Sequence, residues 1–255
     1  MRESVILKKL KNDEVATCFK TNFREPRIVD MIGYAGFDSV WTCMEHVGND
    51  LRDIESQIYA AKSHGMDSVV RVPKGSYSDY IRPFEMDASA IMIPHLMSLE
   101  EAKQIVYYTK FHPIGRRPAD GGNADGNFCA YSGVNYLETS NREKIVICQI
   151  EDPEPMEQIE EIAQLDGIDM LFFGPGDYSH SIGKFGQMND KDVLEPWERM
   201  AAVCKKYGKF AGTVATPDNI EMLHSWGYRF LNMSSDVGGL LQYLAKMIKA
   251  FDKVR

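Results

Sequence analysis

The chain has 255 residues, of which 44% are hydrophobic, and a formal net charge of -8. This length is sufficient for one large core, and no Pro/Gly/Ser-rich linker divides it. A single domain over residues 1–255 is therefore expected, with two small domains as the less favoured arrangement. The acidic balance argues against nonspecific binding to nucleic acid or to anionic membranes, since both need a basic surface.

The cysteines indicate a reducing environment. There are five of them, an odd number, scattered without a CxxC pair: Cys18, Cys43, Cys129, Cys148 and Cys204. This pattern is typical of reduced thiols rather than of a disulfide framework or a zinc site. The opening residues, MRESVILKKLKNDE, show no apolar segment followed by a cleavage site, and no apolar run is long enough to span a membrane. We therefore expect a cytoplasmic protein.

Apolar runs with strand composition alternate with helical patterns along the chain. An amphipathic segment at residues 5–10 comes first and is expected to close the bottom of a barrel. Helices are indicated by apolar residues at helical spacing, as at Leu51, Ile54 and Ile58, and a last helix is predicted over residues 236–251. Strands are predicted at residues 16–19, 39–43, 68–72, 90–93, 145–148, 170–173, 210–214 and 230–233. Eight strands alternating with helices predict a (β/α)8 TIM barrel, with a doubly wound open sheet as the alternative.

The segment 145–179 places acidic residues after two successive predicted strands. The first strand leads into Q-I-E, ending at Glu151, and the second leads into G-P-G-D, ending at Asp177. Because the carboxyl ends of parallel strands face the same rim, these two carboxylates should converge. Such a site, with few protein ligands, suits Mg²⁺ or Mn²⁺ acting as a Lewis acid. The alternative is that both acids are solvated residues or helix caps.

Two more polar residues lie at predicted strand ends. Arg71 stands among the β-branched residues of the third strand, and its guanidinium cannot lose its charge. It should therefore form a structural ion pair with Glu45 or Glu151, or else bind a substrate oxygen. His46 follows the second strand. It is expected to act as a general base, because an imidazole titrates near neutral pH, or to form structural hydrogen bonds.

These motifs resemble the metal-dependent 2-oxo acid aldolases of the HpcH/HpaI family. The resemblance rests on Q-I-E and G-P-x-D and on further short motifs in the same order. These are Ala-Gly-Phe-Asp at residues 35–38, Glu45-His46, Val70-Arg71-Val72-Pro73, Ile93-Pro94, and Gly115 followed by Arg117. Each motif is short, but their order and spacing together are specific and extend over nearly the whole chain.

The resemblance implies a class II pyruvate aldolase on a (β/α)8 barrel. It implies a divalent cation, Mg²⁺ or Mn²⁺ with Co²⁺ as a further candidate, bound by Glu151 and Asp177. A 2-oxo acid substrate would bind this cation, with Arg71 donating to the keto oxygen and the amides of Gly176 and Asp177 receiving the carboxylate. Gln149 belongs to the same substrate-binding set. The implied reaction cleaves a 4-hydroxy-2-oxo acid to pyruvate and an aldehyde through an enolate.

The resemblance also implies that His46 accepts the proton of the C4 hydroxyl, with a water activated by the cation as the alternative. Here the chain departs from the family pattern, because Cys43-Met44 replaces the Asp-Gly that many members have before Glu-His. The family's partner for this histidine, an Asp after the third strand, aligns best with Glu85, which is one methylene longer. Cys43 is interpreted as a thiol inside the barrel and not as a nucleophile.

The chain is predicted to be irregular from His112 to Asn141, between the fourth and fifth predicted strands, and it is rich there in Gly, Asn, Asp and Arg, with residues 118–132 at its centre. Segments of this length are usually functional or disordered, and we expect this one to reach the catalytic rim and meet the distal end of the substrate. Arg117 keeps its position in the family pattern. It is expected either to order the segment or to contact substrate.

Two other mechanisms lack their sequence signatures. A Schiff-base aldolase needs a lysine within a strand end, and the nearest candidates, Lys20 and Lys74, do not lie inside apolar strands. A Rossmann-type enzyme needs GxGxxG after the first strand, where none occurs. Two alternatives stay open. The same pyruvate enolate could serve an oxaloacetate decarboxylase or a macrophomate-synthase-like enzyme, and the barrel could be a non-catalytic binding protein with a relic metal site.

The expected partners are a small 2-oxo acid and further copies of this chain. Members of the resembling family commonly assemble as hexamers, built as trimers of dimers that exchange the last helix. The final helix has an apolar face that permits this exchange, and packing on its own barrel would use the same face equally well. This face carries Leu240, Leu241, Leu244, Met247 and Ile248.

Overall fold

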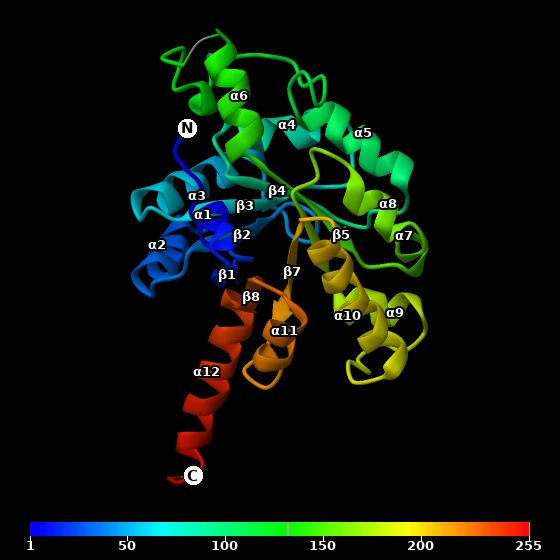
Figure 1. Ribbon diagram of the computed structural model, residues 1–255. Helices are drawn as coiled ribbons and strands as arrows, with labels where there is room; N and C mark the ends of the chain where they lie inside the picture. The colour runs from blue at the N-terminus through cyan, green and yellow to red at the C-terminus, as the bar shows by residue number, and fades with distance from the viewer. Residues whose placement is uncertain (132, 255) are drawn as a thin grey trace.

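Eight parallel strands form a closed barrel in the computed structural model, which describes residues 1–131 and 133–254 (Figure 1). Each strand pairs with the next one along the chain, and β8 pairs with β1. The strands are β1 (Ala16–Lys20), β2 (Ser39–Cys43), β3 (Asp67–Arg71), β4 (Ala90–Ile93), β5 (Ile145–Ile150), β6 (Met170–Phe173), β7 (Phe210–Ala215) and β8 (Phe230–Ser235). The (β/α)8 prediction is confirmed, and the alternative of an open sheet is wrong.

Helices connect the strands and surround the barrel (Figure 1). They are α1 (Val5–Lys11), α2 (Pro26–Tyr34), α3 (Leu51–Ser63), α4 (Tyr77–Glu85), α5 (Leu99–Thr109), α6 (Gly133–Glu143), α7 (Pro153–Glu157), α8 (Ile159–Gln164), α9 (Pro175–Ser181), α10 (Lys191–Lys206), α11 (Ile220–Trp226) and α12 (Asp236–Phe251), with a 3₁₀ turn, η1, at Ala124–Gly126. Because each crossover runs from the carboxyl end of one strand to the amino end of the next, the strand-end residues gather on one rim.

The barrel interior is filled by its own apolar cluster, and α1 extends this cluster at the amino ends of the strands. Ile6, Leu7 and Leu10 of α1 are buried there, in the same cluster as Val69 and Phe172 from the strands. The predicted closure of the barrel by residues 5–10 is therefore confirmed. A second, larger cluster lies between the barrel and the surrounding helices.

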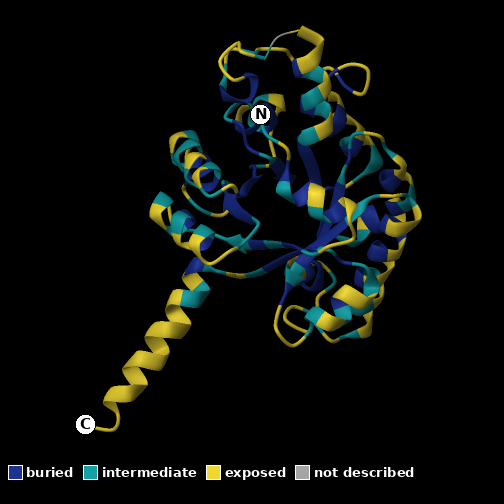
Figure 2. Ribbon diagram, turned by 60° about the vertical axis from the view of Figure 1, so that its left-hand side comes forward, coloured by how far each residue is buried: buried dark blue, intermediate teal, exposed yellow. Residues whose placement is uncertain are grey.

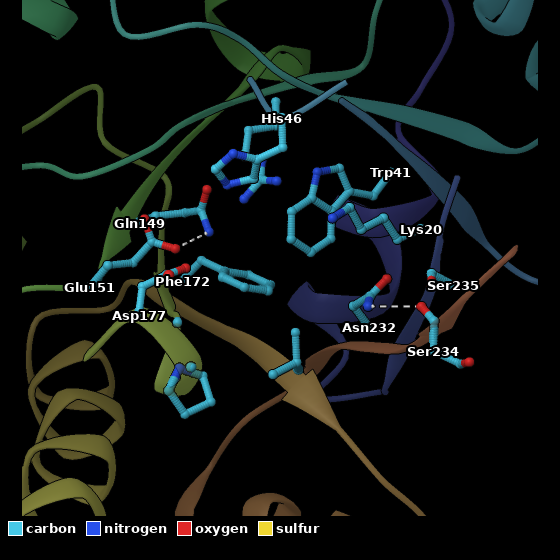
Figure 3. Close-up of a pocket in the computed structure, with 15 residues that line it drawn as sticks. Lys20, Trp41, His46, Gln149, Glu151, Phe172, Asp177, Asn232, Ser234 and Ser235 are labelled. Carbon is cyan, nitrogen blue, oxygen red and sulfur yellow. Dashed lines mark hydrogen bonds between the residues drawn. The ribbon is translucent and has the colours of Figure 1, made fainter. Parts of the chain in front are cut away.

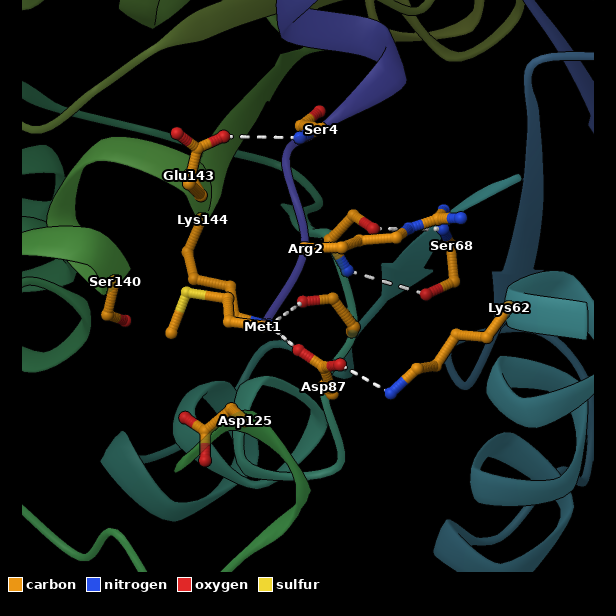
Figure 4. A network of polar contacts seen from close by, with 12 residues as sticks. Met1, Arg2, Ser4, Lys62, Ser68, Asp87, Asp125, Ser140, Glu143 and Lys144 are labelled. Carbon is orange, nitrogen blue, oxygen red and sulfur yellow. Dashed lines mark hydrogen bonds and ion pairs between the residues drawn. The ribbon is translucent and has the colours of Figure 1, made fainter. Parts of the chain in front are cut away.

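Buried charges fix the N-terminal segment at this end of the barrel (Figure 4). The carboxylate of Asp67, the first residue of β3, accepts a hydrogen bond from the Ser4 hydroxyl at 2.6 Å. Asp87 and Lys144 precede β4 and β5 and form an ion pair at 2.6 Å. Such pairs are costly to break when one partner is removed, because the other charge stays buried. They lie at the amino ends of the strands, opposite to the rim formed by the carboxyl ends.

The irregular segment 118–132 also lies at this end, which corrects the expectation that it reaches the catalytic rim. It follows α5, so the chain has already returned to the amino ends of the strands when the segment begins. Arg117 pairs with Asp125 at 2.8 Å, and both side chains are fully buried. Asn127 accepts a hydrogen bond from the Met1 amino group at 2.9 Å. Arg117 therefore orders the segment. Ser132, its last residue, lies outside the described residues.

α12 extends away from the barrel, and nearly all of it is coloured as exposed in Figure 2. Asp236, at its first turn, is the one buried residue of this helix. The apolar face predicted from the sequence is thus uncovered, including Leu240, Leu241, Leu244 and Ile248. Across residues 1–131 and 133–254, every helix is too short or too polar to span a membrane.

Candidate active site

A cavity of about 390 Å³ opens at the carboxyl ends of the strands (Figure 3). The residues that line it include Trp41 from β2 and Phe172 from β6, which form part of its apolar floor. The cavity brings together six of the residues predicted from the sequence, from β2 to α9. These are His46, Arg71, Gln149, Glu151, Gly176 and Asp177.

Glu151 follows β5 directly, and its carboxylate is buried. Its Oε1 accepts a hydrogen bond from Gln149 Nε2 at 2.8 Å, and its Oε2 accepts one from the His95 amide at 3.1 Å. Burial raises the pKa of Glu151 to about 7, and the charge of Asp177 acts in the same direction, while His95 and Arg71 oppose it. The nearby positive charges therefore do not offset the cost of burying the ionised carboxylate, and a bound cation would supply the missing counter-charge.

Asp177 reaches the cavity from the first turn of α9, and Figure 3 shows it next to Glu151. Gly174, before this turn, passes close to the buried carboxyl group. An added Cβ there would lie 2.6 Å from Glu151 Oε1, so only glycine fits without displacing Glu151. An added Cβ at Gly176 would meet nothing within 4 Å. The first glycine makes room for Glu151, and the second keeps space open beside the cavity.

This donor set fits a hard divalent cation such as Mg²⁺ or Mn²⁺. Two carboxylates come from the ends of the hydrogen-bonded strands β5 and β6, and oxygen donors are what these ions prefer. Gln149 Oε1 is buried and has no hydrogen-bond partner among the described residues. The same part of the chain contains no group of three or more His, Cys, Asp or Glu side chains arranged to hold a metal ion. A site with two protein ligands would leave most positions to water or substrate.

Arg71 is the last residue of β3, and its side chain is almost fully buried. Its Nε lies 3.0 Å from Glu45 Oε2, an ion pair without hydrogen-bond geometry. Its Nη2 donates to the sulfur of Cys43 at 3.2 Å, and its guanidinium carbon lies 4.8 Å from the centre of the Trp41 ring. The expected pair with Glu45 is thus present, and the buried position of Cys43 agrees with an interior thiol. These contacts fix the guanidinium at the cavity wall.

His46 lines the cavity with 55% of its side chain exposed, and its Nε2 lies 3.5 Å from Glu45 Oε2. The predicted partner, Glu85, lies elsewhere. It is the last residue of α4, on the side of the barrel near Arg117 and Asp125, and it is not among the residues that line the cavity. The predicted pairing of His46 with Glu85 is therefore wrong within one chain. The end of α4 lies towards the amino ends of the strands, whereas His46 lies at the carboxyl ends. Glu45 is the acid beside His46.

Sequence reasoning missed His95, although it is the second residue after β4. Its amide donates to Glu151, and its Nδ1 lies 2.9 Å from Asp152 Oδ2. Burial lowers the pKa of His95, but the hydrogen bond with Asp152 and the charge of Glu151 outweigh it, and the net pKa is raised. Its backbone has a positive φ of 46°. The rule that polar residues at strand ends face the rim, applied to β4, could have found this residue.

Lys20 and Asn232 also line the cavity, on the side away from the carboxylates (Figure 3). Lys20 is the last residue of β1, and Asn232 lies in β8. The sequence indicated Lys20 only as a poor candidate for a Schiff-base lysine. β1 is one residue longer than predicted, so Lys20 lies within the strand. Its end of the strand is at the same rim as the other residues that line the cavity.

Comparisons with known proteins agree with this geometry. A family model described as HpcH/HpaI aldolase/citrate lyase matches residues 18–242. The hydroxypyruvate/pyruvate aldolase of Roseovarius nubinhibens is 30% identical over 221 residues, which is 86% of each chain. The 5-keto-4-deoxy-D-glucarate aldolase of Klebsiella pneumoniae is 28% identical over 229 residues, 89% of each chain.

The fold comparison gives the same result. The solved structure of an HpcH/HpaI aldolase/citrate lyase family protein from Burkholderia cenocepacia superimposes with a TM-score of 0.90 at 28% sequence identity. The match covers 98% of this chain and 100% of that chain. Sequence and fold are thus similar to one family over almost the whole length.

Proposed function

The chain belongs to the HpcH/HpaI aldolase/citrate lyase family, and we propose that it is a divalent-metal-dependent lyase that cleaves a 4-hydroxy-2-oxo acid to pyruvate and an aldehyde. The observation that carries this proposal is that Glu151, Asp177 and Arg71 line one cavity at the carboxyl ends of the strands. Membership in an aldolase family also favours an enzyme over a non-catalytic binding protein.

Glu151 and Asp177 are the residues that would hold the cation. When bound there, Mg²⁺ or Mn²⁺ supplies a Lewis acid that polarises the keto group of the substrate. Gln149 orients the Glu151 carboxylate through its 2.8 Å hydrogen bond, and its own buried Oε1 remains available as an acceptor for substrate. Orientation of a ligand by a neighbouring hydrogen bond typically changes metal affinity by about 10- to 100-fold.

Arg71 donates a hydrogen bond to the keto oxygen of the substrate, which gains negative charge as the carbon-carbon bond breaks. Glu45, Cys43 and Trp41 already hold the guanidinium in place. A donor that is fixed before the reaction stabilises the transition state without rearrangement. The amides of Gly176 and Asp177, in the first turn of α9, bind the carboxylate of the same 2-oxo acid.

His46 accepts the proton of the C4 hydroxyl. The electrons of that O–H bond then form the carbonyl of the departing aldehyde, and the C3–C4 bond pair moves into the enolate of pyruvate, which is finally protonated at C3. Glu45 lies 3.5 Å from His46 and 3.0 Å from Arg71, so one carboxylate positions both groups. In this proposal Glu45, and not Glu85 of the same chain, is the acid that assists His46.

The proposal is tested by the release of pyruvate from 4-hydroxy-2-oxo acids, with Mg²⁺ or Mn²⁺ present and after removal of metal. We expect release to require the metal and to return when it is added back. Full activity in a verified metal-free sample would refute the roles of Glu151 and Asp177.

Oxaloacetate decarboxylation is the second candidate, because it leaves the same enolate at the same cavity. The observation that favours it is the exposure of His46, whose predicted partner Glu85 is absent from the cavity of its own chain. Decarboxylation needs no base for a hydroxyl proton. Release of carbon dioxide from oxaloacetate that His46→Ala leaves intact, without turnover of any aldehyde, would select this function over the lyase.

Exchange of α12 between two copies is the assembly that we propose. The exposed apolar face of α12 needs a partner, and the same chain offers one in an apolar groove of about 370 Å³. This groove is lined by Phe19, Phe23, Ile28, Met31 and neighbouring residues, and it borders the first turns of α12. Burial of Leu241 and Leu244 by a second copy would remove large apolar side chains from water.

We also propose that the protein acts in a reducing compartment such as the cytoplasm. All five cysteines are free thiols, and only Cys129 is exposed. Burial raises the pKa values of Cys18 and Cys204 to about 12, so these two thiols stay protonated and unreactive.

A further inference from the structure

The indole ring of Trp41 lies at the floor of the cavity, and only 4% of this residue is exposed. Its Nε1 is buried and has no hydrogen-bond partner among the described residues. Trp197 offers a comparison, because it is also buried and its Nε1 donates to the Thr213 hydroxyl at 3.0 Å. Buried indole N–H groups usually find such a partner. Trp41 therefore lacks an acceptor that a buried tryptophan normally has.

The side chains that contact the Trp41 ring cannot accept this hydrogen bond. The ring centre lies 5.1 Å from Lys20 Nζ and 4.8 Å from the guanidinium carbon of Arg71, and both groups are donors only. Phe172 meets the ring edge to face, with the two centroids 5.5 Å apart, and offers an apolar surface. An acceptor for the N–H would therefore come from the cavity that Trp41 lines, and this cavity holds the substrate in the proposed function.

The orientation of the ring indicates which part of the substrate it meets. Figure 3 shows the indole nitrogen on the edge of the ring that is turned to His46 and away from Asn232. In the proposed function, Arg71 binds the keto oxygen and His46 accepts the proton of the C4 hydroxyl. Because the ring contacts Arg71 and its N–H faces the side of His46, the N–H is directed to the region where the C4 oxygen meets its base.

We propose that Trp41 is a further catalytic residue, whose indole N–H donates a hydrogen bond to the C4 oxygen of the substrate. This inference rests on the proposed function, because it takes the roles of Arg71 and His46 from it. As His46 removes the proton, the C4 oxygen gains negative charge, and its electron pair forms the aldehyde carbonyl when the C3–C4 bond breaks. The indole keeps its own proton throughout and stabilises this charge as a fixed donor.

Trp41→Phe tests this role, because it keeps an aromatic ring beside Lys20 and Arg71 and removes the N–H. The assay is cleavage of 4-hydroxy-2-oxopentanoate to pyruvate and acetaldehyde, with Mn²⁺ present. We expect kcat/KM to fall by about 10- to 100-fold, as for a lost hydrogen bond to a charged group. The matched control is Trp226→Phe, which also removes an indole N–H, but at the end of α11 and outside the cavity lining. It should change kcat/KM by less than about 2-fold.

A second measurement separates this role from support of Arg71 by the ring. Exchange of the pyruvate methyl protons in D₂O, followed by NMR, reports enolate formation and involves no C4 oxygen. Trp41→Phe should therefore keep the wild-type exchange rate within about 2-fold while cleavage falls. Retained exchange also shows that the variant is folded.

Two results would overturn the role of Trp41. If Trp41→Phe slows exchange and cleavage equally, the ring supports enolate formation and its N–H does not serve the C4 oxygen. If the variant changes neither rate, the N–H has no part in the reaction. Failure of the proposed function gives a different result, because wild type itself would then show no metal-dependent exchange.

Discussion

Gly174 and Gly176 stand two positions apart beside Glu151, yet the structure constrains them differently. In Gly174→Ala the new Cβ would lie 2.6 Å from Glu151 Oε1, so the carboxyl group must move and metal affinity should fall by about 10-fold or more. In Gly176→Ala the new methyl enters open space, so metal affinity should persist while KM for the 2-oxo acid rises. Mn²⁺ titration and steady-state kinetics of both variants check this pair. Equal loss of metal binding in both would contradict it.

Arg71 should affect catalysis more than any exposed cation. Its partner charge develops in the transition state, so Arg71→Ala should reduce kcat/KM by about 10²- to 10³-fold, the range for removal of one preorganised donor. The control is Arg27→Ala, since Arg27 is 82% exposed on α2. Pyruvate release measures both. If the two variants lose the same small factor, Arg71 is a structural ion-pair residue of Glu45 and not a donor to substrate.

The site residues could be predicted from the sequence because a simple rule holds in parallel barrels. Polar residues at the carboxyl ends of apolar strands, such as Gln149, Glu151 and Arg71, reach the same rim. Residues that depend on the path of a loop were not predicted. His95 reaches Glu151 through a left-handed backbone conformation. Glu85, predicted from a position in the family pattern, lies at the end of α4 and not at the end of a strand.

At the level of elements, α1 should stabilise the barrel by closing its lower end. Ile6 is fully buried against the interior cluster, so Ile6→Ala should reduce the free energy of unfolding by about 2–5 kcal/mol. Lys8→Ala, at an exposed position of the same helix, should change it by less than about 0.5 kcal/mol. Urea denaturation followed by circular dichroism measures both values. Similar values for the two variants would show that α1 is not part of the core.

Strand positions were predicted closely because these strands are buried on both faces and read as continuous apolar runs, as in β5 and β6. For the irregular segment 118–132, the sequence predicted the wrong end of the barrel. The composition of residues 112–141 predicted a loop, which is correct for residues 118–131 and wrong for residues 133–141, because these belong to α6. The end of the barrel at which the loop lies follows from the element before it. Since α5 precedes it, the segment lies at the amino ends of the strands, where Arg117 and Asp125 anchor it.

At the scale of the whole molecule, the proposed assembly depends on α12. If two copies exchange this helix, the double variant Leu241→Glu/Leu244→Glu should dissociate the protein, because charges would face the apolar groove of the partner. Lys246→Glu, on the same helix but outside the apolar face, should keep the assembly intact. Sedimentation velocity gives the mass of each species. An unchanged mass for the double variant would contradict the exchange.

The sequence alone could not decide how α12 packs, because one apolar face serves exchange and self-packing equally. α12 leaves the barrel (Figure 2), and an apolar groove borders its first turns, which supports the proposed exchange. The barrel itself was predictable from the alternation of strands and helices, which concerns neighbouring elements only. Periodicity within one chain carries no information about the contacts of a terminal helix with a second copy.

The central claim is that Glu151 and Asp177 together bind one divalent cation. Titration with Mn²⁺, followed by the loss of its free electron paramagnetic resonance signal, measures this directly in wild type, Glu151→Gln and Asp177→Asn. We predict one site per chain in wild type and a loss of affinity of at least about 10-fold in each variant. The same stoichiometry and affinity in all three proteins would contradict the account.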